Sequence, residues 1–144
     1  MAKYNINVQL VSQITHVPDE KSLIKWAKLA LQSCDIDGAS LTIRVVNRAE
    51  GQVLNNTYRG KDYATNVLTF VYHDVGAKQL EGDIVICAQV VNREANEQQK
   101  RPQNHYAHLT IHGVLHLAGF DHVKLNDAKV MEAREAALLA KLKI

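Results

Sequence analysis

The sequence predicts an α/β fold in which a small mixed sheet of about four strands is flanked by helices, within a single domain of residues 1–144. The first observation is the order of the patterns, which runs strand, helix, strand, helix, strand, strand and then three helices. The second is composition, because 144 residues with 47% hydrophobic content can bury one sizeable core. The third is a histidine-rich helix in the C-terminal third, which predicts a metal site.

The first strand and the first helix show two different periodicities. Residues Tyr4–Val11 alternate between apolar and polar side chains, as a half-buried strand does. Pro18, Asp19 and Glu20 then begin a helix that is expected to end near Cys34. The expected inward residues are Ile6, Val8 and Leu10 in the strand, and Leu23, Trp26, Ala27, Ala30 and Leu31 in the helix.

A second strand, a short helix and a polar loop come next. Ala39–Val46 alternates again and predicts a strand, and Ala49–Tyr58 predicts a short helix. The polar sequence YRGKDYATN at residues 58–66 is expected to be a loop. The inward residues of this second strand are expected to be Leu41, Ile43 and Val45.

The middle of the chain predicts a β-hairpin. Val67–Tyr72 is rich in β-branched and aromatic residues, and Val75–Leu80 reads as a connecting turn. Asp83–Cys87 is a continuous apolar run, which indicates a strand buried on both faces. We expect the two strands to pair antiparallel.

Three helices are expected after the hairpin. Helical periodicity returns over Ala88–Gln99, and Pro102 interrupts it. The histidine-rich helix is expected over residues 103–118, and Asn126 is expected to cap a last helix that ends near Leu142. In that last helix the residues available for packing are Val130, Met131, Ala133, Leu138 and Leu139.

Composition narrows the class of protein. A net charge of +2 permits a nucleic-acid partner without requiring one. Cys34 and Cys87 form no paired motif, so neither a disulfide framework nor a cysteine metal site is expected. The N-terminal residues lack the pattern of a signal peptide, and no apolar stretch is long enough to cross a membrane. We expect a cytoplasmic protein with no membrane partner.

The sequence HGVLHLAGFDH at residues 112–122 carries the strongest chemical signal. His112 and His116 are four residues apart, which on a helix places them about 40° apart around the axis and one turn apart along it. Gly119 can end the helix in the left-handed conformation and let the chain bring His122 back. Three imidazoles with a fourth position open for water are typical of a catalytic zinc site.

Two further histidines lie on the same helical face as His112. His108 and His116 are too far apart along a straight helix to share one metal ion, so His108 is expected to support a ligand or form a wall of the site. His105 is expected to be exposed.

The same histidine spacing occurs in the metzincin zinc peptidases, whose signature places a glutamate directly after the first histidine as general base. Here that position is Gly113, which cannot take a proton. Asp83 and Asp121 are the carboxylates that could replace it. Asp121 could also orient a histidine or cap a turn, and Asp83 could be a turn residue.

A phosphodiester suits a metal site without a glutamate, because its transition state needs positive charge. Arg59 and Lys61 supply such charge in the loop over residues 58–66, and the Arg59 guanidinium matches a phosphate with two parallel hydrogen bonds. The alternative is that both are solvated loop charges without a partner.

At this point the residues resemble a known family. HGVLHLAGFDH, together with LNNTYRGKDYATNVLTF at residues 54–70 and EGDIVIC at residues 81–87, is similar to the YbeY family of bacterial endoribonucleases, also called rRNA maturation factors. The resemblance implies a small mixed sheet flanked by helices. It implies one metal ion, expected to be Zn²⁺, on His112, His116 and His122, and a functional arginine at Arg59.

The resemblance also implies the substrate and the partners. Members mature the 3′ end of the small-subunit ribosomal RNA and act in ribosome quality control, in the cytoplasm, with ribosomal proteins and ribosome-associated factors. We therefore expect a metal-dependent endoribonuclease of single-stranded ribosomal RNA. Arg59, His112 and His116 are the expected catalytic residues, and Arg59 and Lys61 the expected RNA-binding residues.

This chain departs from the family's loop at a few positions. The family's loop commonly reads T-D-V-L-S-F-P, whereas this chain has Asn66 in place of the aspartate and Val71 in place of the proline. A carboxylate that many members carry is therefore replaced here by an amide.

Two other functions remain open from the sequence. A zinc hydrolase of a peptide or amide would need a carboxylate base near the metal. A non-catalytic ribosome-binding module would use the metal only to hold the C-terminal region. Three imidazoles also suit nickel, copper or iron, so the ligand set does not identify the metal.

Overall fold

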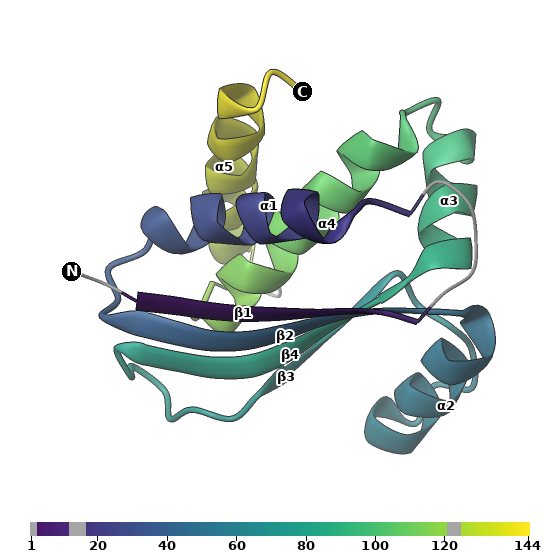
Figure 1. The fold of residues 1–144 in the computed structure, drawn as a ribbon, viewed down its shortest axis with the longest axis horizontal. Helices are drawn as coiled ribbons and strands as arrows, with labels where there is room; N and C mark the ends of the chain where they lie inside the picture. The colour runs from purple at the N-terminus through teal and green to yellow at the C-terminus, as the bar shows by residue number, and fades with distance from the viewer. Residues whose placement is uncertain (1–2, 12–16, 121–124) are drawn as a thin grey trace.

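The computed structural model describes residues 3–11, 17–120 and 125–144. One four-stranded sheet has the strand order β1-β2-β4-β3 (Figure 1). β1 pairs with β2 and β2 with β4 in parallel, whereas β3 pairs with β4 antiparallel. The predicted mixed sheet and its hairpin are confirmed. The strands are β1 Lys3–Leu10, β2 Gly38–Val46, β3 Val67–Val71 and β4 Gln79–Cys87.

The helices cover the two faces of the sheet unequally. In Figure 1, α1, α3, α4 and α5 lie on one side of the sheet and α2 lies on the other. α4 packs against both α1 and the sheet, and α5 packs against α4. The helices are α1 Glu20–Gln32, α2 Arg48–Arg59, α3 Ala88–Glu97, α4 Pro102–Leu117 and α5 Leu125–Lys141. Among the described residues, no helix is both long and apolar enough to cross a membrane.

The main core lies between the sheet and the helices of the larger layer. The Ser22 N–H donates to Asp19 Oδ1 at 2.9 Å, so Asp19 caps α1 at the position where the sequence predicts a helix start. All five residues predicted for the buried face of α1 are buried, and so are the three predicted for β2. The periodicity therefore identified the core face of both elements.

A smaller apolar cluster lies on the other face of the sheet. Val46, Leu68 and Val85 are buried there, with Leu54 of α2 packed against them. Toward β1 the same face is polar, since the Arg44 guanidinium donates hydrogen bonds to Glu50 and Gln9. β4 is thus covered on both faces, as its continuous apolar run predicts.

Several local predictions were wrong. Leu10 is 45% exposed because it lies at the end of edge strand β1, beyond the covering helices. Val130 and Ala133 are exposed, since only one narrow side of α5 packs on α4. Asn126 is a residue of α5 and not the cap before it. β4 begins at Gln79, so Gln79 and Leu80 belong to the strand and not to the connecting turn as predicted.

α4 approaches β4 closely because each element has a glycine at the contact. Gly82 of β4 lies against α4, and Gly113 of α4 lies against β4. A Cβ atom at Gly82 would lie 2.5 Å from the Phe70 backbone oxygen and 2.7 Å from Leu117 Cδ2. A Cβ atom at Gly113 would lie 3.0 Å from Ile84 Cγ2. Because neither residue has a side chain, the histidine-bearing helix α4 can pack in close contact with the sheet.

We expect Gly82→Ala to lower the free energy of unfolding by about 3 kcal/mol, because neither the Phe70 carbonyl nor the packed Leu117 can move aside without disturbing the sheet. Gly51→Ala is the matched control. It adds the same methyl group to a buried glycine of α2, at an ordinary 3.4 Å from Cys87. Urea unfolding of both variants checks this, and equal stability of Gly82→Ala and the wild type would contradict it.

Candidate active site

His112 and His116 lie one turn apart on α4 and line one cavity of about 430 Å³ together with Arg59. The rest of its lining is the segment that enters β3, Thr65 to Thr69. α4 ends as the sequence predicts, with Gly119 at φ 104° and the Phe120 N–H donating to the Leu115 oxygen at 3.0 Å. The structure thus brings Arg59 together with the pair of histidines that the sequence predicted.

Arg59 reaches this cavity from the opposite face of the sheet. It is the last residue of α2, not part of the following loop as predicted, and Gly60 at φ 69° ends the helix there. β3 is an edge strand, so the end of α2 on one face and α4 on the other face can meet around that edge. The helix predicted from the sequence ended at Tyr58, one residue before the observed end of α2.

The loop after Arg59 is held by side-chain hydrogen bonds. Buried Asn55 donates from Nδ2 to the Tyr63 oxygen at 2.7 Å, and Gln52 donates to Asp62 Oδ1 at 3.0 Å. Lys61 is exposed and is not among the residues that line the cavity. Of the two predicted phosphate-binding cations, only Arg59 therefore faces the histidines.

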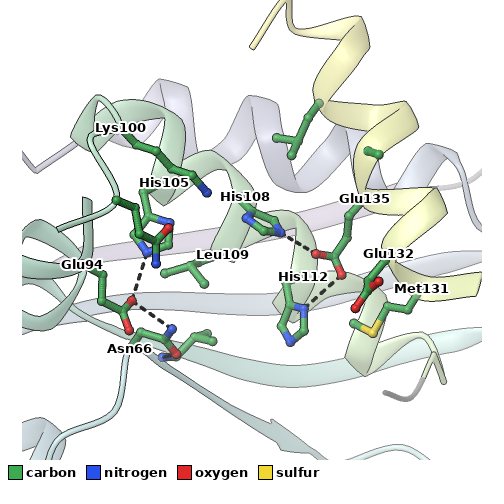
Figure 2. Close-up of a pocket in the computed structure, with 14 residues that line it drawn as sticks. Asn66, Glu94, Lys100, His105, His108, Leu109, His112, Met131, Glu132 and Glu135 are labelled. Atoms are coloured by element: carbon green, nitrogen blue, oxygen red, sulfur yellow. Dashed lines mark hydrogen bonds and ion pairs between the residues drawn. The ribbon is translucent and has the colours of Figure 1, made fainter. Parts of the chain in front are cut away.

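Glu135 of α5 is a candidate site residue that the sequence reasoning missed. Glu135 is 5% exposed, and its carboxylate accepts hydrogen bonds from His108 Nε2 at 2.5 Å and His112 Nδ1 at 3.1 Å (Figure 2). The prediction that His108 supports the site is consistent with this bond. One signal was present: Glu135 shares a helical face with the apolar residues Met131 and Leu138.

Hydrogen bonds from two histidines lower the pKa of Glu135. Burial alone would raise the pKa of this carboxyl, but hydrogen bonds from His108 and His112 outweigh burial and lower the pKa from 4.5 to about 2. The carboxylate is therefore charged at neutral pH. It fixes the orientation of the His112 ring by holding Nδ1, which leaves Nε2 on the side of the ring away from Glu135 (Figure 2).

This donor set fits a divalent metal ion. Two imidazoles one turn apart border a cavity, and a carboxylate orients one of them, as is usual for metal-bound histidines. His122, the predicted third ligand, and Asp121 lie outside the described residues. Within residues 3–11, 17–120 and 125–144 no three histidine, cysteine or acidic side chains gather into a metal-binding group.

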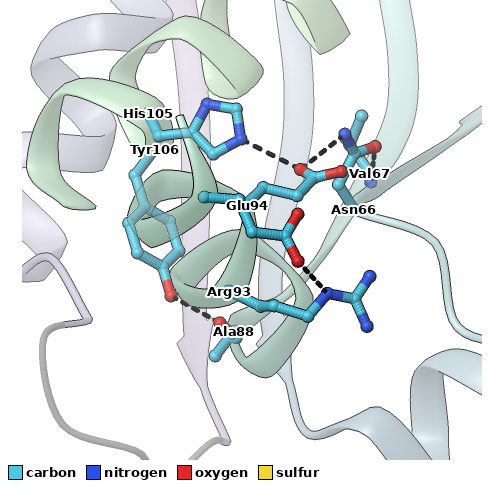
Figure 3. A network of polar contacts seen from close by, with 8 residues as sticks. Asn66, Val67, Ala88, Arg93, Glu94, His105 and Tyr106 are labelled. Carbon is cyan, nitrogen blue, oxygen red and sulfur yellow. Dashed lines mark hydrogen bonds and ion pairs between the residues drawn. The ribbon is translucent and has the colours of Figure 1, made fainter. Parts of the chain in front are cut away.

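A second network lies beside the site and corrects the prediction for His105. His105 is 4% exposed, not solvent-exposed, because its Nε2 bonds Glu94 Oε1 of α3 at 2.9 Å. Asn66 Nδ2 donates to the same Glu94 oxygen at 3.0 Å, and Asn66 Oδ1 accepts from the Val67 N–H at 2.7 Å (Figure 3). Since Oδ1 is committed to Val67, the atom facing Glu94 is the amide donor. The amide at position 66 thus ties the cavity wall to α3.

We expect Asn66→Asp to destabilise the protein by about 2 kcal/mol, because it places a carboxylate against Glu94 with no donor between them. Adding Glu94→Gln should recover most of this loss, since the glutamine can donate to the introduced carboxylate while it still accepts from His105. Asn96→Asp makes the same charge change at an exposed position of α3 and should have little effect. Thermal unfolding of the wild type, Asn66→Asp, Glu94→Gln and the double variant measures the coupling, and additive effects would contradict it.

Asp83, one of the two carboxylates that could serve a peptidase, does not line this cavity. Gly82 and Ile84 face α4, so Asp83 between them faces the other side of the sheet. Its Oδ2 there accepts a hydrogen bond from the Tyr72 hydroxyl at 2.8 Å. Gly113 faces Ile84, so a longer side chain at that position would meet the sheet.

Comparison with known proteins places the chain in a family. A family model described as "Endoribonuclease YbeY" matches residues 6–143. The "Endoribonuclease YbeY" of Thiobacillus denitrificans is 48% identical over 95% of this chain and 90% of its own length. The protein of that name from Pseudomonas putida is 53% identical over 87% of this chain and 81% of its own length.

A solved structure shares the fold. The solution structure of TM1509 from Thermotoga maritima superposes with a TM-score of 0.67 at 25% sequence identity, covering 93% of this chain and 86% of that one. The four-stranded mixed sheet with its covering helices is thus an architecture already observed. Together with the family model and the curated relatives, these similarities show that the chain belongs to the YbeY family.

Proposed function

We propose that this protein is a metal-dependent endoribonuclease that cleaves single-stranded ribosomal RNA. Membership of the YbeY family, whose relatives bear the name endoribonuclease, supports the nuclease activity. The observation that carries the proposal is the cavity lined jointly by Arg59, His112 and His116. It combines metal-ligating side chains with a guanidinium that suits a phosphate.

His112, His116 and His122 would hold the metal, which we propose to be Zn²⁺. When bound, the ion supplies positive charge and lowers the pKa of water at the site. Arg59 binds the phosphate oxygens, and Glu135 keeps the His112 ring in its orientation. Among the described residues that line this cavity there is one cation and no carboxylate, which favours a phosphodiester over a peptide substrate.

The biological role that we propose is maturation of the small-subunit ribosomal RNA 3′ end, with ribosome quality control as a second role. The family resemblance supports both, and it supports a cytoplasmic protein that works with ribosomal proteins or ribosome-associated factors. The net charge of +2 is compatible with an RNA partner.

Metal analysis combined with RNA cleavage tests the proposal. The purified protein should contain about one metal ion per chain and cleave a fluorescently labelled single-stranded RNA internally. Removal of the ion with a chelator should abolish cleavage, and Zn²⁺ should restore it. Metal-free protein that cleaves at the full rate, or metal-loaded protein that never cleaves RNA, would overturn it.

We expect Glu135→Gln to weaken zinc binding about 10- to 100-fold, because a neutral amide holds the His112 ring less firmly than a carboxylate does. Glu132→Gln is the matched control, since it removes an exposed carboxylate from the same helix. Competition with a chromophoric chelator measures both affinities. Equal affinities of the two variants would show that Glu135 serves only the packing of α5.

A further inference from the structure

We propose that a second cavity, between α3, α4 and α5, binds a nucleobase that bears an exocyclic amino group. The proposal rests on the proposed function, since it makes this cavity part of the RNA-binding site. It assigns to the protein a base-binding site next to the phosphate-binding one.

The position of the cavity is the first argument. It measures about 540 Å³, within the usual range for small-molecule sites, and shares Asn66, Val67 and His112 with the cavity of Arg59. The two cavities therefore adjoin. An RNA strand whose phosphate lies at Arg59 can therefore place a neighbouring base in the second cavity.

The walls of the cavity are the second argument. Leu109 of α4 and Leu139 of α5 supply apolar surface, and polar groups surround it. An unstacked base needs this combination, because its ring faces are apolar and its edge carries hydrogen-bonding groups. A hydrated cation would gain nothing from the apolar walls.

Charge is the third argument, and it separates the two cavities. The cavity of Arg59 has one cation and no carboxylate among its described lining residues, whereas the second has three carboxylates, Glu94, Glu132 and Glu135, and one lysine, Lys100. The carboxylates outnumber the lysine and can accept hydrogen bonds from the amino groups of adenine, cytosine and guanine. Glu94 and Glu135 already accept from histidines, so exposed Glu132 at the rim is the carboxylate that we assign to the base amine.

Adenosine, which has no phosphate, is the probe for this site. Its addition to the metal-loaded protein should shift the methyl NMR signals of Leu109 and Leu139 in a saturable manner, and uridine, which lacks an amino group, should bind several-fold more weakly. Ala136→Phe should abolish the response, because exposed Ala136 lines the cavity and a phenyl ring there would fill it. Ala137→Phe adds the same ring at the neighbouring exposed position, which does not line the cavity, and should leave the response intact.

Three results would overturn the proposal. They are unchanged Leu109 and Leu139 signals, an equal response in Ala136→Phe, and equal binding of uridine. Circular dichroism of both variants verifies the fold. Cleavage of single-stranded RNA provides the second readout, with about a tenfold loss expected in Ala136→Phe and none in Ala137→Phe. Nucleoside binding needs no turnover, so a protein that binds adenosine but does not cleave RNA would refute the proposed function alone.

Discussion

His116→Ala is expected to yield a folded protein that contains no metal and cleaves RNA about 1,000-fold more slowly than the wild type. His116 borders the cavity beside His112 and Arg59, and loss of one of the three proposed imidazole ligands would leave too few for stable binding. Elemental analysis and single-turnover cleavage of a labelled RNA measure both effects. Gln103→Ala, an exposed substitution on the same helix, is the control and should change neither.

A folded His116→Ala protein that lacks metal but still processes RNA normally would refute a catalytic role for the metal. Metal retained at the wild-type level would instead remove His116 from the ligand set. Circular dichroism and thermal unfolding verify that the variant is folded before either conclusion is drawn.

Arg59→Ala is expected to retain its metal and to lose RNA cleavage about 100- to 1,000-fold, because it removes the cavity's guanidinium from the developing negative charge. Arg59→Lys should recover only part of the rate, since an ammonium group cannot form two parallel hydrogen bonds to one phosphate. Single-turnover cleavage with metal analysis of the same samples separates this loss from a loss of metal.

Lys61→Ala is the matched control for Arg59. It removes one cation two residues away, from an exposed position outside the cavity. We expect RNA binding to weaken only several-fold, with a smaller dependence on salt concentration. If Lys61→Ala lost cleavage as completely as Arg59→Ala, the overall charge of the loop and not the cavity would explain the effect.

The spacing of apolar residues identified most helices and strands, because backbone geometry fixes the interval at which side chains return to the same face. The spacing of Leu23, Trp26 and Ala30 predicted the buried face of α1, and these residues are buried. Asn66 could be noticed in the sequence as an amide where many relatives have a carboxylate. Only the structure shows its reason, which is the hydrogen bond to Glu94.

The sequence by itself determined the strands, the β3–β4 hairpin, the helices and the spacing of His112 and His116, because contacts within one helix or one hairpin repeat at fixed intervals along the chain. Tertiary structure decided which distant residues join that pair. Arg59 arrives around the edge of β3, and Glu135 arrives when α5 packs on α4. It also buried His105 against Glu94. Such contacts depend on how helices cross and how deeply they pack, and no local periodicity in the sequence encodes that geometry.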